Sequence, residues 1–305
     1  MQPLKINNQT LAWGERTYVM GILNATPDSF SGDGLLPSPT PPFNSPPASG
    51  GGEGGGGEAL AQAHRFVDAG ADILDVGGES TRPGSEPVNA DDEMARVIPI
   101  IREISRQIPE TLISVDTYKA SVAKAALEAG AHIVNDVWAL RADPELASVV
   151  ASFGCPVILM HNRSNPASVE VREQLGKAYA GAEYDDLLED VKRELLESVE
   201  LAKQAGVADE AIILDPGIGF GKTIAQNLVL NDRLDDIRAL GYPVLLGPSR
   251  KSYIGYTLDL PADQRVEGTA AAVAVGIARG ADIIRVHDVK EMVRIARMTD
   301  AIVRR

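Results

Sequence analysis

The chain has little cysteine, no excess of positive charge and no long apolar run. Cys155 is its single cysteine, so an internal disulfide framework is excluded. The formal net charge is −14 at pH 7, which argues against a general nucleic-acid or anionic-membrane surface. No apolar stretch approaches the ~20 residues of a membrane span, and no basic region followed by an apolar core opens the chain. We therefore expect a protein of a reducing compartment, cytoplasmic or stromal, without nucleic-acid or membrane partners.

Short apolar segments alternate with segments of helical periodicity along the chain. The expected strands are 18–24, 73–76, 111–115, 132–135, 157–161, 211–214, 244–247 and 283–286. The expected helices are 58–69, 90–107, 118–129, 144–153, 185–205, 225–240, 266–279 and 290–304. Strict alternation indicates parallel βαβ units. Eight such units in 305 residues favour a single (β/α)8 TIM barrel over residues 1–305. A doubly wound open sheet is the alternative, but the first strand lacks a Gly-x-Gly-x-x-Gly turn.

Three of the predicted helix-to-strand junctions have nearly the same sequence. They read Ala69-Gly-Ala-Asp-Ile-Leu74, Ala129-Gly-Ala-His-Ile-Val134 and Arg279-Gly-Ala-Asp-Ile-Ile284, so the glycines are Gly70, Gly130 and Gly280. A glycine just past a helix adopts the left-handed conformation that ends it. Short, reused turns of this kind are typical of a repeating barrel.

Residues 35–57 are unlike the rest of the chain, because they contain six prolines and seven glycines. Such a composition cannot form a core and needs no secondary structure. The segment falls inside the first loop between a strand and a helix. We predict a low-complexity flexible insertion there, and we favour an inert insertion over a mobile lid.

Polar side chains occur where each apolar strand ends. They are Asn24, Asp75 with Glu79 to Arg82, Asp116, Asn135 and Asp136, His161, Asp215, Arg250 and Lys251, and Arg285 with His287. The carboxyl ends of all eight strands of a TIM barrel meet at one mouth. Any one of these residues could be a turn or capping residue. Eight polar tips together indicate one binding or catalytic site.

The segment from Asp215 to Thr223 resembles a phosphate-binding loop, but the match fails. The template requires a glycine five positions before Gly221, and Pro216 stands there. We interpret the glycines as allowing the backbone to approach a flat ligand, with Phe220 available for stacking.

Seven motifs, in order, make the chain similar to one enzyme family. They are Asn24-Ala-Thr-Pro-Asp-Ser-Phe-Ser31, Asp75-Val-Gly-Gly-Glu-Ser-Thr-Arg-Pro-Gly84, Ser114-Val-Asp-Thr117, Ile133-Val-Asn-Asp136, Asp215-Pro-Gly-Ile-Gly-Phe-Gly-Lys222, Gly247-Pro-Ser-Arg-Lys-Ser252 and Ile284-Arg-Val-His-Asp-Val289. From about residue 18 to 295 the chain resembles dihydropteroate synthase. The resemblance implies a TIM-barrel transferase, usually a homodimer, that uses Mg²⁺. Its reaction joins 6-hydroxymethyl-7,8-dihydropterin diphosphate to p-aminobenzoate and releases diphosphate, as a step of folate synthesis.

The resemblance also implies a role for each matching residue. The pterin would contact Asp116, Asn135, Asp215 and Lys251, and the diphosphate would contact Thr81, Arg82, Arg285 and His287. The p-aminobenzoate pocket would consist of Thr81, Pro83, Phe220 and Ser252, and Asn24 would bind the metal. Lys251, Arg285, His287 and Asp116 form the implied catalytic set. A carboxylate suits the guanidine-like donor edge of a pterin, and an amide oxygen suits Mg²⁺.

Two stretches depart from the family pattern. The first loop reads Ser29-Phe-Ser-Gly-Asp33-Gly before the insertion, which puts the role of Asp33 in doubt. After the fifth strand the chain reads Met160-His-Asn-Arg163, and the sequence leaves open whether His161 and Arg163 face the site. Two other functions stay open, a corrinoid-type pterin-binding methyltransferase domain and a non-catalytic pterin-binding paralogue.

Overall fold

Eight parallel strands form a barrel in the order in which they occur along the chain. The computed structural model describes residues 1–26, 54–80, 85, 87–165, 169–172, 176–179 and 181–304. The strands are β3 (Tyr18–Asn24), β4 (Ile73–Gly77), β5 (Leu112–Asp116), β6 (Ile133–Asp136), β7 (Val157–Met160), β10 (Ile212–Asp215), β11 (Leu245–Leu246) and β12 (Ile283–Val286). A parallel bridge between Leu214 and Val244 joins β10 to β11 and closes the ring. The predicted (β/α)8 barrel is confirmed, and the open-sheet alternative is wrong.

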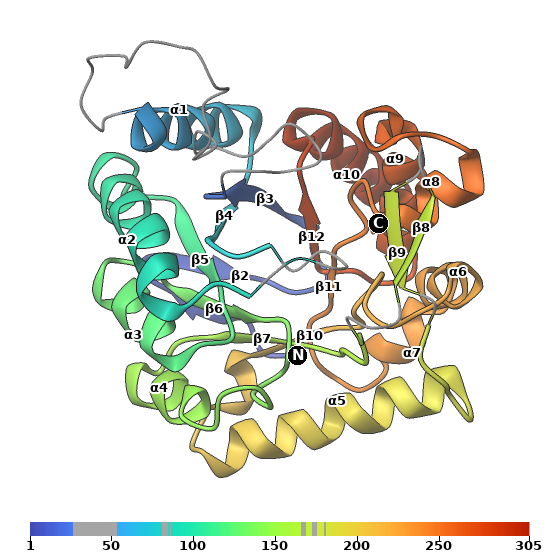
Figure 1. Ribbon diagram of the computed structural model, residues 1–305, viewed down its shortest axis with the longest axis horizontal. Helices are drawn as coiled ribbons and strands as arrows, with labels where there is room; N and C mark the ends of the chain where they lie inside the picture. Colours follow the sequence, from blue (N-terminus) through green and yellow to red (C-terminus); the bar gives the residue numbers. More distant parts are fainter. Residues whose placement is uncertain are drawn as a thin grey trace.

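Helices surround the strands on the outside of the barrel (Figure 1). They are α1 (Gly54–Ala69), α2 (Ala90–Gln107), α3 (Ala120–Glu128), α4 (Leu146–Phe153), α5 (Leu187–Gln204), α6 (Ile224–Asp232), α7 (Leu234–Arg238), α8 (Ser252–Leu258), α9 (Val266–Ala278) and α10 (Val289–Val303). Residues 54–57 belong to α1, so the predicted insertion ends earlier than expected. The rest of the insertion, and Asp33 before it, lie outside the described residues.

Several elements differ from the sequence-based expectation. The predicted helix 225–240 is two helices that meet at Arg233, and this break lets Leu234 and Ile237 point into the core. Helix α8 was not predicted. Neither were the hairpins β1 (Leu4–Ile6) with β2 (Gln9–Leu11) and β8 (Val169–Arg172) with β9 (Gly176–Tyr179). The glycine junctions are as expected, because Gly70, Gly130 and Gly280 all have φ between 100° and 113°.

The barrel interior consists of an apolar floor with a polar layer above it. Residues Ile73, Leu112, Ile133, Ile213 and Ile283 form the floor, together with Met20, and the β1–β2 hairpin packs against it through Leu4, Ile6 and Leu11. Successive side chains of a strand alternate between its two faces, so residues two positions further on also point inward. Those residues are Asp75, Ser114, Asn135, Asp215 and Arg285. The period of the strands therefore places five polar side chains in one layer.

The outer faces of the strands pack against the helices in a second apolar cluster that includes Leu74, Val115, Val134 and Leu214.

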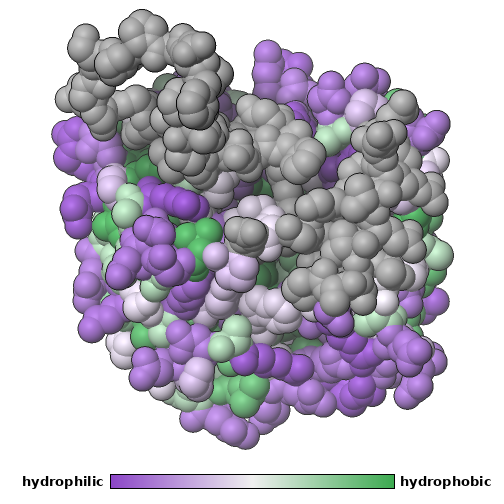
Figure 2. Space-filling model, viewed as in Figure 1, coloured by the Kyte–Doolittle hydropathy of each residue, from purple (hydrophilic) through white to green (hydrophobic). Residues whose placement is uncertain are grey.

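None of the helices in the described ranges is both long and apolar enough to span a membrane. The surface over α5 is mostly hydrophilic (Figure 2), because this helix turns acidic and basic residues outward and buries Val191, Leu195 and Val199. The site at the barrel mouth therefore stands on a well-packed scaffold.

Candidate active site

Arg285 links two carboxylates at the mouth of the barrel. Its Nε donates to Oδ2 of Asp75 and its Nη2 donates to Oδ2 of Asp116, each at 2.6 Å. Asn135 also donates to Oδ2 of Asp75, at 3.2 Å. Burial alone would lower the pKa of Arg285, but the two carboxylates raise it above its usual value. Burial raises the pKa of Asp116, and Arg285 partly offsets that shift. The sequence named Asp75 as a strand-tip residue without assigning it a role.

Three buried oxygens in this layer make no hydrogen bond to any described residue. They are Oδ1 of Asp75, Oγ of Ser114 and Oδ1 of Asp116. Asp75 and Ser114 are fully buried. A buried acceptor without a donor is costly, so sites of this kind are completed by a ligand or by water. The two carboxylate oxygens therefore suit a ligand that presents N–H groups along one edge.

Asp215 and Lys251 influence each other electrostatically at the barrel mouth. Oδ1 of Asp215 accepts a hydrogen bond of 2.7 Å from the backbone N–H of Gly217. Burial raises the pKa of Asp215, and Lys251 is the main opposing charge. Burial lowers the pKa of Lys251 to about 8, against the attraction of Asp215. A carboxylate and a cation that share one site can recognise donor and acceptor groups of one ligand.

Phe220 lies against the same lysine. Lys251 Nζ is 4.7 Å from the centre of the Phe220 ring, and it donates to the backbone carbonyl of Ile218. This is the geometry of a cation–π contact. Ser252 follows directly and begins helix α8, where it is partly buried. The predicted pterin lysine and two residues of the predicted p-aminobenzoate pocket are therefore close together.

His287 is oriented by Ser249. The Ser249 hydroxyl accepts from the backbone N–H of His287 at 3.1 Å and lies 3.0 Å from Nδ1 of its ring. His287 and Arg285 are two residues apart at the end of β12. The neighbouring Arg250 is used differently, because its guanidinium binds both oxygens of Asp288, at 2.9 and 2.5 Å. Arg250 therefore stabilises the rim of the barrel mouth through its contact with Asp288.

Asn24 ends β3 next to the polar layer, with Gly77 of β4 as its partner in the sheet. Its side chain is partly exposed, and no hydrogen bond among the described residues uses its amide. Nowhere in the described ranges do three or more histidine, cysteine, aspartate or glutamate side chains gather as a metal site. A metal at Asn24 would thus take most of its ligands from substrate and water, which is the usual coordination of Mg²⁺.

Three predicted site residues, Thr81, Arg82 and Pro83, lie outside the described residues. The chain that leads to them is anchored by Glu79. Its carboxylate accepts from the Tyr118 hydroxyl at 3.1 Å and from Lys119. Lys119 also donates to Glu93 of α2 at 2.5 Å, and Glu93 is fully buried.

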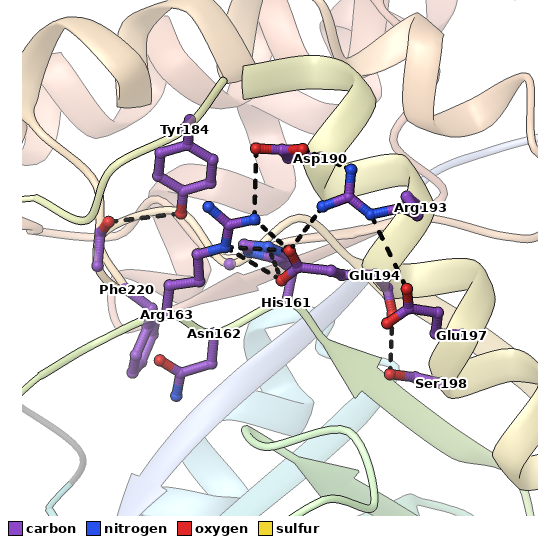
Figure 3. Close-up of polar contacts among 12 residues, drawn as sticks. His161, Asn162, Arg163, Tyr184, Asp190, Arg193, Glu194, Glu197, Ser198 and Phe220 are labelled. Atoms are coloured by element: carbon purple, nitrogen blue, oxygen red, sulfur yellow. Dashed lines mark hydrogen bonds and ion pairs between the residues drawn. The ribbon is translucent and has the colours of Figure 1, made fainter. Parts of the chain in front are cut away.

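His161 and Arg163 both point toward Glu194 of α5 (Figure 3). Arg163 binds Glu194 of α5 and lies 4.3 Å from the centre of the Tyr184 ring. His161 is buried between Glu194 and Lys222. Both residues therefore belong to a network outside the barrel mouth, which the sequence left open.

The glycines of the 217–221 segment serve packing within the protein. A Cβ at Gly217 would lie 1.8 Å from the carbonyl oxygen of His161, and one at Gly221 would lie 2.3 Å from the carbonyl carbon of Arg163. Our interpretation of close approach to a ligand missed this role, because it depends on the position of the β7 loop.

A cavity of about 360 Å³ lies at the opposite end of the barrel, among residues that include Trp13, Asp209 and Tyr242. These residues precede strands or end the N-terminal hairpin. The cavity contains none of the predicted site residues, so it does not compete with the mouth as the active site.

Comparison with known proteins agrees with this geometry. The family described as "Pterin binding enzyme" matches residues 52–287. Dihydropteroate synthase from Clostridium beijerinckii is 48% identical over 303 residues, which cover 99% of this chain and 100% of the relative. The chain belongs to the dihydropteroate synthase family. The predicted resemblance and the predicted enzyme class, a transferase, are thus confirmed.

Solved structures of this family have the same fold. The synthase from Clostridium difficile, determined in the presence of pteroic acid, has a TM-score of 0.81 and 44% identity, over 96% of this chain and 99% of that one. The synthase from Xanthomonas albilineans with 4-aminobenzoic acid has a TM-score of 0.80 and 38% identity, over 96% of this chain and 94% of that one.

Proposed function

We propose that this chain joins 6-hydroxymethyl-7,8-dihydropterin diphosphate to p-aminobenzoate, giving 7,8-dihydropteroate and diphosphate. The observation that carries the proposal is the buried polar layer with Asp116 beside it, where Asp75 and Asp116 each keep one carboxylate oxygen without a donor among the described residues. Family membership and relatives solved with pteroic acid and with 4-aminobenzoic acid support it. The corrinoid-type methyltransferase is less well supported, because that chemistry needs no diphosphate site.

The pterin binds in the polar layer. Asp215 and Asp116 accept hydrogen bonds from its guanidine-like edge, Asn135 completes the edge, and Lys251 donates to the acceptor side. Bonds between a charged group and a donor of this kind contribute about 1.5–3 kcal/mol each. A ring without these groups would leave buried polar atoms unpaired, which makes the site selective.

The diphosphate lies towards Thr81, Arg82, Arg285 and His287. Arg285 uses two of the five N–H groups of a guanidinium on Asp75 and Asp116, so it can still donate to a phosphate oxygen. These donors stabilise the negative charge that builds up on the leaving group as the bond from the pterin methylene carbon to oxygen breaks.

Asn24 would hold Mg²⁺ through its amide oxygen, and the remaining ligands would come from the diphosphate and water. The amide at the end of β3, which makes no hydrogen bond to the part of the chain that the structure describes, fits this role. When bound, the ion supplies Lewis-acid stabilisation of the departing diphosphate.

The p-aminobenzoate lies between Phe220, Ser252, Thr81 and Pro83. Its amine is uncharged at neutral pH, so its nitrogen lone pair can form the new bond to the methylene carbon without a strong general base. The diphosphate leaves with the electron pair of the broken bond, and the amine then loses one proton to water. Lys251 and Asp116 act by holding the pterin where this exchange occurs.

We also propose a single domain over 1–305, with the insertion that precedes α1 inert, and a cytoplasmic homodimer. Helices α9 and α10 contact each other and expose Val275, Met298 and Ile302, whose exposed fractions are 43%, 64% and 53%. Exposed apolar side chains on adjacent helices are typical of a subunit interface.

The decisive experiment is a synthesis assay. The purified chain is incubated with Mg²⁺, the pterin diphosphate and p-aminobenzoate, and both dihydropteroate and diphosphate are measured. Equal amounts of the two products are expected. Absence of product at high enzyme concentration would rule out the synthase, and tight pterin binding without turnover would identify the non-catalytic alternative.

A further inference from the structure

We propose that Lys222 is a positioning residue for the loop that carries Phe220 and contacts Lys251, and that it acts through His161 as its hydrogen-bond acceptor. The inference rests on the proposed function, since it assigns these residues a part in substrate binding. Lys222 belongs to the Gly-Phe-Gly-Lys motif, for which the reaction gives no role.

Lys222 is buried, and its ammonium group is surrounded by acceptors. It donates to the carbonyl oxygens of Gly217 at 2.9 Å and Phe220 at 3.0 Å, and it lies 3.0 Å from Nδ1 of His161. A fourth acceptor, the backbone carbonyl of His161, is further away at 3.5 Å. The three shorter contacts match the three protons of an ammonium group. No carboxylate within the described residues forms an ion pair with it. Burial lowers the pKa of Lys222 to about 7, against the attraction of Asp215. The side chain therefore acts as a buried hydrogen-bond donor around which the 217–221 loop folds.

The contact with Lys222 also determines the protonation of His161. In its charged form Lys222 can only donate, so Nδ1 of His161 then accepts and the ring proton is on Nε2. Nε2 then donates to Oε2 of Glu194 at 3.1 Å. Burial and the charge of Lys222 lower the pKa of His161 to about 4, which keeps the ring neutral.

Glu194 lies on α5, and it is bound both by the loop that follows β7 and by a neighbouring residue of its own helix. Arg163 donates to it from Nε at 3.1 Å, and Arg193 donates from Nη2 at 3.3 Å (Figure 3). A continuous chain of contacts thus runs from α5 through His161 and Lys222 to the 217–221 loop.

The β7 and β10 loops touch where this chain crosses between them. The close approach of Gly217 and Gly221 to the backbone of His161 and Arg163 leaves no room for a side chain. One backbone hydrogen bond joins the two segments, from the N–H of His161 to the carbonyl of Asp215 at 2.9 Å. The Lys222 side chain adds a second connection, to Nδ1 of His161.

The tethered loop presents three groups to the site. The N–H of Gly217 binds Asp215, the carbonyl of Ile218 binds Lys251, and the ring of Phe220 packs on the same lysine. A shift of the loop would therefore displace the predicted p-aminobenzoate contact at Phe220. Misplacement by a fraction of an ångström is expected to weaken binding well before it unfolds the barrel.

The test uses isosteric substitutions of His161. In His161→Asn the side-chain oxygen takes the place of Nδ1 and can still accept from Lys222, but the contact with Glu194 is lost. In His161→Gln the amide nitrogen takes the place of Nε2 and can still donate to Glu194, but the side-chain acceptor for Lys222 is lost and only the more distant backbone carbonyl at 3.5 Å remains. Lys222→Met removes all three donors, and Lys203→Met makes the same exchange on an exposed part of α5.

The KM for p-aminobenzoate, kcat and the melting temperature are measured for each variant. We expect Lys222→Met and His161→Gln to raise KM by about tenfold or more while kcat changes by less than about threefold. We expect His161→Asn and Lys203→Met to stay within about threefold of the unmodified chain in KM. Equal changes in KM for the two His161 variants, or changes that follow only the melting temperature, would overturn the proposal.

A second measurement does not depend on activity. Hydrogen exchange of the backbone amides in 217–222 should be faster in His161→Gln than in His161→Asn, because the tether is lost only in the first. Equal exchange would count against the inference, and it can be read even if Lys222→Met fails to fold. An inactive unmodified chain would refute the synthase instead, and would leave the exchange comparison intact.

Discussion

Arg285 and Asp116 are joined across the barrel mouth by a hydrogen bond of 2.6 Å between Nη2 and Oδ2. Their strands, β12 and β5, are not neighbours, because β3 and β4 lie between them. The same guanidinium holds Asp75 of β4. One side chain therefore braces three strands and keeps two carboxylates compatible in a buried layer.

Replacement of Arg285 by Met should destabilise the fold. It would leave Asp75 and Asp116 buried without a cation, and breaking a buried pair from one side costs about 3–5 kcal/mol. Unfolding in urea, followed by circular dichroism, gives the free energy directly. Arg106→Met is the control, because Arg106 binds Glu103 at the same 2.6 Å on the exposed face of α2. A similar loss for both variants would show that burial is not the cause.

Replacement of Lys119 by Met should also destabilise the fold, and by a similar mechanism. Lys119 holds Glu79 and the fully buried Glu93, so its loss leaves two carboxylates facing each other. The expected cost is again about 3–5 kcal/mol. Adding Glu93→Gln should recover part of this loss, since it removes the buried charge. If the double variant is less stable than Lys119→Met alone, the ion pairs are not the source of the effect.

The sequence predicted the fold well because its signals are local. The alternation of apolar strands and helices, and the glycines at Gly70 and Gly130, depend only on nearby residues. Helix α8 was missed because it has only seven residues and follows a motif that we read as functional. The β1–β2 hairpin had a signal in the sequence, since alternating residues flank Asn7 and asparagine is common in tight hairpin turns. In the structure Asn7 has the positive φ of such a turn, 53°.

The candidate site was predicted as a set of residues but not as a set of partners. Strand period places Asp75 and Arg285 inside the barrel, yet nothing in the sequence says that they bind each other. The same holds for Lys222 and His161, which are 61 positions apart and meet only because the β7 and β10 loops are packed together. Long-range pairs of this kind depend on tertiary packing, and no periodicity encodes them.

Substitution of Asp215 by Asn should weaken pterin binding. The variant loses a charged acceptor and, with it, about 1.5–3 kcal/mol, which corresponds to roughly 10- to 150-fold in affinity. Isothermal calorimetry with a pterin that lacks the diphosphate measures this without turnover. Substitution of Asp232, an exposed aspartate at the end of α6, by Asn provides the control. Unchanged pterin affinity in Asp215→Asn would place the pterin elsewhere.

The activity should fall as the pH rises through about 8, where Lys251 loses its proton. Below that pH the ammonium group can donate to the acceptor side of the pterin, and above it the charge is gone. The kcat/KM for the pterin diphosphate should then decrease by about tenfold for each further pH unit. Lys251→Arg keeps its charge throughout this range, so its profile should lack the decrease, although its absolute rate is lower.

The free energy of unfolding should change with pH in the opposite direction to the activity, and through the same lysine. The pKa of Lys251 is lower in the folded chain, about 8, than the ordinary value of 10.5. Between these values the unfolded chain binds one more proton than the folded chain, so the contribution of Lys251 to stability rises with pH there and is lost as the pH falls through about 8. Lys251→Met should remove this part of the slope in urea unfolding measured from pH 8 to 10. A slope that is the same with and without the lysine would mean that Lys251 titrates normally, and the decrease in activity would then need another group.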